Sequence, residues 1–170
     1  MATSVAISLD QYLHTSYRPD CDYIDGEVQE RNLGETEHSD LQTRLVELLL
    51  TPESKRYVRA TTEPRVQVRE ARFRIPDVCV RRVSDPKEQF IRRPPLLCIE
   101  VLSPEDTLAR MMTKLGDYER MGIQTILILD PNGRHFRFTG GKLEPLPAEP
   151  FDLPGSACRF DLGEIEKLLD

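Results

Sequence analysis

The chain has 170 residues, of which 39% are hydrophobic and 31% are charged, with 13 prolines. This length and composition allow one globular domain over residues 1–170 and exclude a disordered chain. No apolar run approaches the roughly 20 residues that span a membrane, so we expect no membrane partner. The first ten residues have neither the basic start nor the apolar block of a signal peptide, which predicts a cytoplasmic protein.

Charge is distributed unevenly along the chain. The net charge is −6, which argues against non-specific binding of nucleic acid by the whole surface. Residues 56–93, however, contain eleven basic and five acidic side chains, a local charge of +6. Such a segment is either an ordinary solvated surface or a basic stripe for a polyanion on an otherwise acidic protein.

The first third of the chain predicts two helices separated by a hairpin. Ser8 and Gln11 form a capping box at the start of a short helix that continues through Leu13. The dipeptide Asp25-Gly26 favours a tight turn between two short strands. Leucines at helical spacing predict a second helix over 36–50.

Strands dominate the middle of the sequence. Residues 64–69 alternate apolar and polar side chains, and residues 73–80 form a second candidate strand. Residues 96–102 form a continuous apolar run that contains one charge, Glu100. Apolar runs of this kind are typical of strands that are covered on both faces of a sheet.

The last part of the chain predicts a helix, a strand, a hairpin and a final helix. Ser103 is the expected N-cap of a helix that ends near Gly122. A strand over 125–130 follows, and Asn132-Gly133 predicts a hairpin turn after it. Residues 162–169 predict a C-terminal helix. The expected fold is of the α/β (mixed α+β) class, with a mixed sheet flanked by helices.

The main chemical signal is a pair of carboxylates. The sequence contains no phosphate-binding loop, dinucleotide fingerprint, nucleophile elbow or HExxH motif. Asp77 lies in the second candidate strand, and Glu100 is embedded in the next one. A buried carboxylate is costly unless it is paired or bound to a cation. If the two strands are neighbours, Asp77 and Glu100 can converge on one divalent ion. The alternative is that each carboxylate pairs with one of the many arginines.

Other side chains could contribute to the same site. Lys114 falls at the edge of the apolar face of its helix, so it can point back toward the sheet and stabilise charge on a phosphate. His38 is on the apolar face of the helix over 36–50, where a packed or capping histidine is the more common role. Glu27 and Glu63 are further candidate carboxylates.

Several short segments occur in an order that resembles the Uma-type restriction endonucleases, a bacterial branch of the PD-(D/E)XK nuclease superfamily. The resemblance spans roughly residues 8–145. The segments are, in chain order, Tyr23–Val28, His38-Ser39, Phe73–Val78, Ile99–Pro104, Lys114, Tyr118, Gly122 and Ile128–Pro131.

The resemblance implies a restriction-endonuclease-like core and a Mg²⁺-dependent DNA endonuclease, with Mn²⁺ as a substitute. It implies that Asp77 and Glu100 are catalytic metal ligands, and Glu63 is a further candidate ligand. The superfamily's lysine normally follows the second acid by two residues, where this chain has Leu102. In the Uma-type branch the lysine is displaced onto the next helix, which makes Lys114 the catalytic lysine.

The resemblance also implies supporting residues and partners. Glu27 and His38 match the N-terminal motif and would complete the site. DNA is the implied substrate, and by analogy a homodimer would cut both strands. The arginines that flank the Asp77 strand are the expected contacts for DNA phosphates: Arg72, Arg74, Arg81 and Arg82.

Two other functions are consistent with the same residues. The chain could be a catalytically inactive module of the nuclease fold that binds DNA or a protein. It could also be an interaction protein in which Glu100 forms only a buried ion pair.

Overall fold

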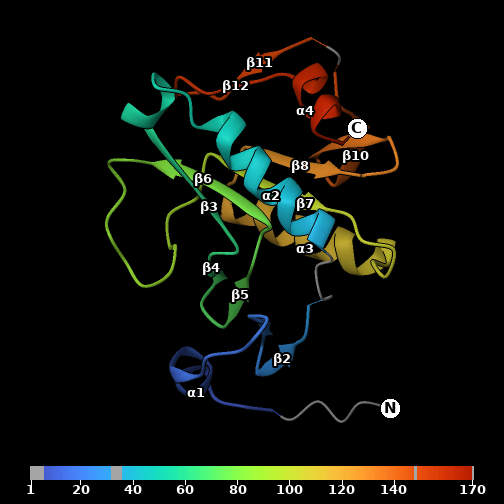
Figure 1. The fold of residues 1–170 in the computed structure, drawn as a ribbon. Helices are drawn as coiled ribbons and strands as arrows, with labels where there is room; N and C mark the ends of the chain where they lie inside the picture. Colours follow the sequence, from blue (N-terminus) through green and yellow to red (C-terminus); the bar gives the residue numbers. More distant parts are fainter. Residues whose placement is uncertain (1–5, 32–35, 148, 170) are drawn as a thin grey trace.

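A six-stranded sheet is the centre of the molecule in the computed structural model, which describes residues 6–31, 36–147 and 149–169 (Figure 1). The strand order is β10-β9-β8-β7-β6-β3. Strands β7 and β8 are parallel and the other neighbours are antiparallel, so the sheet is mixed, as predicted. Its strands are β3 (Val58–Thr62), β6 (Val78–Arg82), β7 (Leu97–Val101), β8 (Thr125–Leu129), β9 (His135–Thr139) and β10 (Lys142–Pro145).

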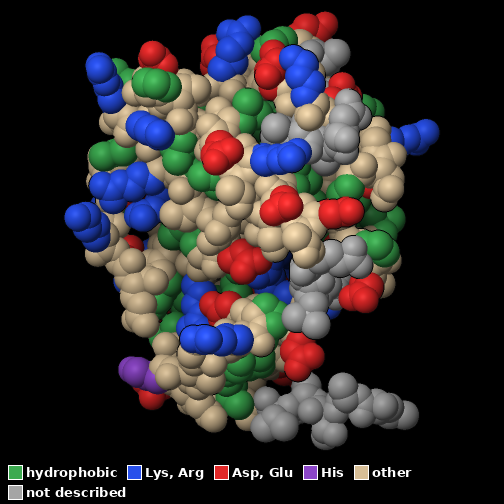
Figure 2. Space-filling model, viewed as in Figure 1, with side chains coloured by type: hydrophobic (Ala, Val, Ile, Leu, Met, Phe, Trp, Pro, Cys, Tyr) green, Lys and Arg blue, Asp and Glu red, His purple; other side chains and the backbone are tan. Residues whose placement is uncertain are grey.

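A second, four-stranded sheet lies against the first near the N-terminal end of the chain (Figure 1). Its order is β2-β1-β5-β4, and an aromatic cluster that includes Tyr12, Tyr23 and Phe73 packs beside it. Charged side chains of both signs gather where these N-terminal elements meet the main sheet (Figure 2). The elements are α1 (Leu9–His14), β1 (Asp22–Ile24), β2 (Glu27–Gln29), β4 (Val66–Arg69) and β5 (Arg72–Arg74).

Helices cover both faces of the main sheet. Helices α2 (Thr36–Leu49) and α4 (Leu162–Leu169) contact each other, and α2 contributes Leu45 to a core formed with one sheet face. Helix α3 (Leu108–Met121) packs on the opposite face. The smaller elements are a 3₁₀ turn (Ser54–Arg56) and the β11 (Phe151–Asp152) and β12 (Arg159–Phe160) pair. Among the described residues, no helix is long and apolar enough to span a membrane.

The strand expected over residues 73–80 is wrong, because this segment forms two strands in different sheets. Strand β5 ends at Arg74 and β6 begins at Val78. Pro76 cannot donate to a strand ladder, and the Ile75 N–H donates to Asp22 Oδ1 at 3.0 Å. The chain therefore crosses between the sheets immediately before β6 and leaves Asp77 at the crossing.

The predicted start of helix α3 at Ser103 is also wrong. The Asp106 carboxylate accepts hydrogen bonds from the Ser103 N–H and hydroxyl at 2.8 and 3.1 Å, which closes a turn. Thr107 is the N-cap instead, and its side chain accepts from the Arg110 N–H. The predicted end is confirmed, since Gly122 adopts a left-handed φ of 98°.

Candidate active site

Asp77 and Glu100 are brought together by adjacent strands of the main sheet. Strands β6 and β7 pair with Val78 opposite Ile99, so the condition for the two carboxylates to converge is met. The Val101 N–H donates to Asp77 Oδ2 at 2.7 Å. Asp77 and Glu100 are 4% and 3% exposed, so each carboxylate depends on protein partners for stabilisation.

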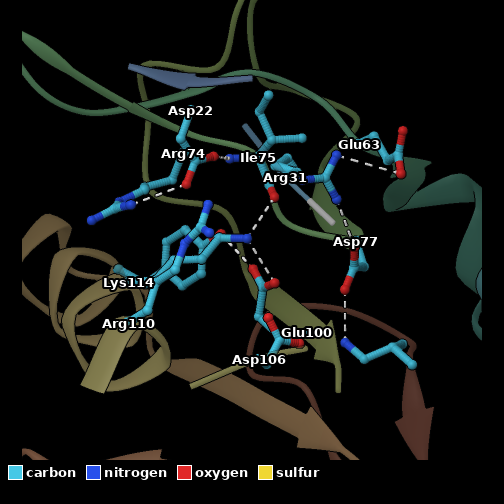
Figure 3. Close-up of polar contacts among 12 residues, drawn as sticks. Asp22, Arg31, Glu63, Arg74, Ile75, Asp77, Glu100, Asp106, Arg110 and Lys114 are labelled. Carbon is cyan, nitrogen blue, oxygen red and sulfur yellow. Dashed lines mark hydrogen bonds and ion pairs between the residues drawn. The ribbon is translucent and has the colours of Figure 1, made fainter. Parts of the chain in front are cut away.

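Helix α3 supplies the partners of Glu100. Lys114 and Tyr118 are one turn apart, and both point from α3 toward the sheet. The Lys114 ammonium donates to Glu100 Oε2 at 2.7 Å and to the Ile75 carbonyl at 2.8 Å (Figure 3). The Tyr118 hydroxyl donates to Glu100 Oε1 at 2.6 Å. Both oxygens of Glu100 are therefore oriented by a single helix.

Helix α2 supplies partners of Asp77 in the same way. His38 and Gln42 are also one turn apart. His38 Nε2 is 3.5 Å from Asp77 Oδ2, and the Gln42 amide donates to Asp77 Oδ1 at 3.2 Å. His38 thus faces a carboxylate and is neither a helix cap nor an apolar core residue. Two helices on opposite sheet faces each hold one of the two carboxylates through a pair of side chains.

A third carboxylate is linked to this pair through Arg31. The Arg31 guanidinium donates to Asp77 Oδ1 at 2.7 Å and is 3.4 Å from Glu63 Oε1 (Figure 3). Gln42 also reaches Glu63, at 3.3 Å. Glu63 has a φ of 51°, which is unusual for a residue with a side chain and is often found at functional sites. Arg31 thus occupies the space between Asp77 and Glu63.

Burial and neighbouring charges shift the pKa values of the two carboxylates in opposite directions. Burial raises the pKa of Glu100 to about 7, and the nearby Lys114 ammonium only partly opposes this shift. Burial would also raise the pKa of Asp77, but the hydrogen bond from His38 and the charges of Lys114 and Arg31 hold that pKa below its ordinary value. Asp77 is therefore ionised at neutral pH, whereas Glu100 exchanges a proton near neutrality.

The carboxylates in turn raise the pKa values of His38 and Lys114. A hydrogen bond with Asp77 raises the pKa of His38. Burial lowers the pKa of Lys114, but the negative charges of Glu100, Asp22 and Asp77 outweigh it and raise that pKa above its ordinary value. Lys114 therefore carries a positive charge beside Glu100.

The donor atoms of this site fit a hard divalent ion. Mg²⁺ prefers carboxylate oxygens and is commonly held by one or two of them, with water completing its coordination. Asp77, immediately before β6, and Glu100 of the adjacent β7 provide such oxygens, and Arg31 links Glu63 to Asp77. In the described part of the chain, no three His, Cys, Asp or Glu side chains form a ready-made cage. A metal ion at these oxygens would compete with the Arg31 guanidinium, which pairs with Asp77, and with the Lys114 ammonium, which pairs with Glu100.

Glu27 lies apart from these residues. It is an exposed residue of β2, in the hairpin formed by β1 and β2. No contact joins it to Asp77 or Glu100 among the residues that the structure describes. The structure thus groups Asp77, Glu100, Lys114 and His38, with Glu63 at the side.

The expectation that Arg74 contacts DNA phosphates is wrong. Arg74 is 1% exposed, and its guanidinium pairs with Asp22 at 3.0 Å and with Asp117 at 2.7 Å. Arg72 is also engaged, by Asp117 at 2.9 Å and by Asp25. These arginines join the small sheet to helix α3. Arg81 is half-buried and Arg82 is exposed at the end of β6.

Three side chains of the site were not identified from the sequence as candidates: Arg31, Gln42 and Tyr118. A signal existed for two of them. Gln42 follows His38 by four residues and Tyr118 follows Lys114 by four, so each shares a helix face with a predicted residue. Arg31 lies outside the helices and strands and has no periodic pattern that could have identified it.

Comparison with known proteins agrees with this architecture. No curated protein matches the sequence. A solved structure described as a putative nuclease belonging to DUF820 from Anabaena variabilis has 21% identity, covers 96% of this chain and 99% of its own, and superposes with a TM-score of 0.77. It shares the fold. Residues 9–150 match the Uma2 family, described as "Putative restriction endonuclease". The chain therefore belongs to the Uma2 family.

Proposed function

We propose that the protein is a metal-dependent DNA endonuclease whose active site is the Asp77–Glu100 pair. The observation that supports this most directly is the juxtaposition of two buried carboxylates, Asp77 immediately before β6 and Glu100 within the adjacent β7, with a buried lysine 2.7 Å from Glu100. Family membership and the shared fold point the same way. Asp77 and Glu100 would hold Mg²⁺ or Mn²⁺, and Glu63 is the candidate third ligand.

When bound, a divalent ion polarises the phosphate and lowers the pKa of its water. The residues of this chain orient and neutralise the groups around that reaction. The Val101 N–H and His38 fix the rotamer of Asp77, while Tyr118 fixes that of Glu100. The Lys114 ammonium lies beside Glu100, where it would stabilise negative charge that develops on the phosphate oxygens. Arg81 and Arg82 remain candidate contacts for DNA phosphates.

Nicking of supercoiled plasmid tests this function. The purified chain is incubated with Mg²⁺ or Mn²⁺ beside the Asp77→Ala and Lys114→Ala variants, with EDTA as the metal-free control. We expect the wild type to cleave in the presence of metal, and we expect no cleavage by Asp77→Ala, by Lys114→Ala or in EDTA. Asp40→Ala and Lys55→Ala are matched controls, because both side chains are exposed and lie outside the site, and they should cleave like the wild type.

The result discriminates between parts of the proposal. Cleavage that is lost in Asp77→Ala but kept in Lys114→Ala would leave the carboxylates in place and remove the lysine from the mechanism. The absence of metal-dependent cleavage by the wild type on duplex, branched and single-stranded DNA would favour the inactive binding module. That alternative has support in the structure, since Arg31, Lys114 and Tyr118 already engage the carboxylate oxygens.

A further inference from the structure

A cavity lies at the open edge of the main sheet, beside β3 and under the loop that follows β6. Its volume is about 280 Å³. Its walls include Thr61 of β3, Arg81 of β6, and Arg92 and Arg93 of the loop. Basic side chains gather on this side of the molecule, at the left of the view in Figure 2, over β3, β6 and the loop.

Two of the residues that line the cavity each have a buried polar atom without a partner. Arg81 Nε and Thr61 Oγ1 are inaccessible to solvent and make no hydrogen bond within the described part of the chain. Strands β3 and β6 pair with Arg59 opposite Arg81 and Thr61 opposite Cys79, so Arg81 and Thr61 lie on the same sheet face. Buried donors without partners are rare and destabilising in proteins, and an unoccupied ligand site is one explanation for them.

The charges around the cavity favour an anion. Arg59 and Arg81 are directly opposite each other on adjacent strands, an arrangement that is destabilising for like charges. Arg81 and Arg93 form no ion pair among the described residues, whereas Arg92 pairs with Glu88 at 3.1 Å. The cavity wall contains two acidic residues, Asp85 and Glu88, and four arginines. One of the four, Arg65, is neutralised by Asp20.

The donors select a phosphoryl group. A guanidinium presents several N–H groups in one plane, which matches the oxygens of a phosphate. The Thr61 hydroxyl is buried and would add a further donor when its side chain turns toward the ligand. The cavity volume accommodates a phosphoryl group with part of its ester. Phosphate esters of this kind come either from a nucleic-acid backbone or from a free phosphorylated compound.

The cavity adjoins the candidate active site. Thr62 and Pro64 line it, and Glu63 between them turns toward Arg31 and Gln42. We propose that this cavity binds a backbone phosphate of the nucleic-acid substrate and positions the strand relative to the Asp77–Glu100 pair. This inference rests on the proposed nuclease function, and it assigns Arg81, Arg93 and Thr61 to substrate binding.

Binding of fluorescent duplex DNA in EDTA tests the inference without requiring cleavage. We expect Arg81→Gln to weaken binding roughly tenfold or more, as the loss of a charged hydrogen bond predicts. We also expect it to reduce the slope of log K against log salt by about one unit. Lys87→Gln is the matched control, because Lys87 is an exposed residue of the same loop that does not line the cavity; it should change affinity less than about twofold.

Thr61→Val provides a second variant that does not depend on charge. It removes a buried hydroxyl without a partner, so the variant should unfold at a temperature equal to or above that of the wild type. It should nonetheless bind DNA several-fold more weakly. Circular dichroism and thermal melting of each variant confirm that lost binding is not lost folding.

A parallel titration with inorganic phosphate identifies the source of the ligand. If phosphate raises the melting temperature of the wild type but not of Arg81→Gln, while DNA affinity is equal in the two, the cavity serves a free phosphate and the inference is wrong. Equal DNA affinity and salt slope for Arg81→Gln and Lys87→Gln would also overturn it. Plasmid nicking is scored separately, so a chain that binds through Arg81 without cleaving contradicts the nuclease proposal alone.

Discussion

At the candidate site, ion pairs fix the positions of individual carboxylates, and Arg31 takes part in two of these pairs. Its guanidinium bridges Asp77 and Glu63 from a segment outside the helices and strands. A cation of the chain therefore neutralises the carboxylates that a metal ion would need. A metal ion bound as proposed would therefore compete with the Arg31 guanidinium for these oxygens.

Removing the Arg31 charge should strengthen metal binding. Because a positive charge close to the carboxylates opposes a second cation, Arg31→Gln is expected to raise the affinity for Mn²⁺ roughly tenfold or more. Titration calorimetry on the metal-free protein measures this directly. Weaker Mn²⁺ binding by Arg31→Gln than by wild type would show that Arg31 supports the site.

The protonation of Glu100 predicts a pH dependence of stability. Its pKa rises from 4.5 to about 7 on folding, so the folded protein binds this proton more tightly than the unfolded chain. The stabilisation is complete below about pH 4.5 and is lost as the pH rises through about 7. Relative to Glu100→Gln, the wild-type free energy of unfolding should therefore fall by a few kcal/mol over this range, since one pKa unit corresponds to about 1.4 kcal/mol.

Urea denaturation of both proteins at about pH 5 and about pH 8 provides the comparison. A constant difference between wild type and variant would mean that Glu100 has the same pKa in the folded and unfolded chains.

The backbone of Glu63 predicts an unusual order of variants. Its φ of 51° is unfavourable for any residue with a Cβ but not for glycine. Glu63→Gly and Glu63→Ala both remove the carboxylate, so their difference isolates the backbone. The glycine variant should be the more stable by about 1 kcal/mol. An alanine variant of equal or greater stability in urea denaturation would contradict the strained conformation.

At the level of elements, the two sheets and helix α3 are joined by buried ion pairs. Arg74 extends from β5 and contacts Asp22 of β1 and Asp117 of α3. This link holds the small sheet against the helix that carries Lys114. The position of the candidate lysine therefore depends on ion pairs between segments that are far apart in sequence.

Truncation of Arg74 should cost stability. Arg74→Ala leaves the buried Asp22 carboxylate without its cation and removes one of the three cations of Asp117; breaking a buried pair in this way destabilises a protein by about 3–5 kcal/mol. Arg134→Ala is the control, because Arg134 is exposed and its change should stay within about 0.5 kcal/mol. Urea denaturation gives both changes in the free energy of unfolding. Equal changes would mean that the ion pairs of Arg74 make no net contribution to stability.

At the scale of the whole molecule, the basic segment over residues 56–93 and the acidic remainder would have opposite effects on a polyanion. Four arginines of β3, β6 and the following loop form no ion pair among the described residues: Arg59, Arg81, Arg82 and Arg93. The chain as a whole carries −6. A polyanion would therefore be bound by one face and repelled by the others.

This distribution predicts a moderate salt dependence of DNA binding. Each phosphate contacted in a duplex contributes a slope of about −0.9 to log K against log salt. Contacts from these arginines should give a total slope between roughly −2 and −4, measured by anisotropy in EDTA over a range of NaCl concentrations. A slope near zero would mean that the basic segment is a solvated surface.

Much of the architecture is predictable from local patterns. The helices at 36–49 and 162–169, the capped helix at 9–14 and the apolar strand around Glu100 were expected within a few residues, because periodicity and caps depend only on neighbours in sequence. The edge strand β3 was not expected. Its residues Arg59 and Thr61 resemble a polar loop, and they form a strand because β6 supplies their hydrogen-bond partners.

The sequence by itself indicated a candidate site of two carboxylates and one lysine, since a charge within an apolar strand requires a partner. It could not determine which cations are the partners. Only the tertiary structure showed that Arg74 pairs with Asp22 and Asp117 and that Arg31 pairs with Asp77 and Glu63. It also showed that Arg81 lines a cavity. Electrostatic pairing depends on distances between segments that are remote in sequence, and those distances exist only after the sheets and helices have packed.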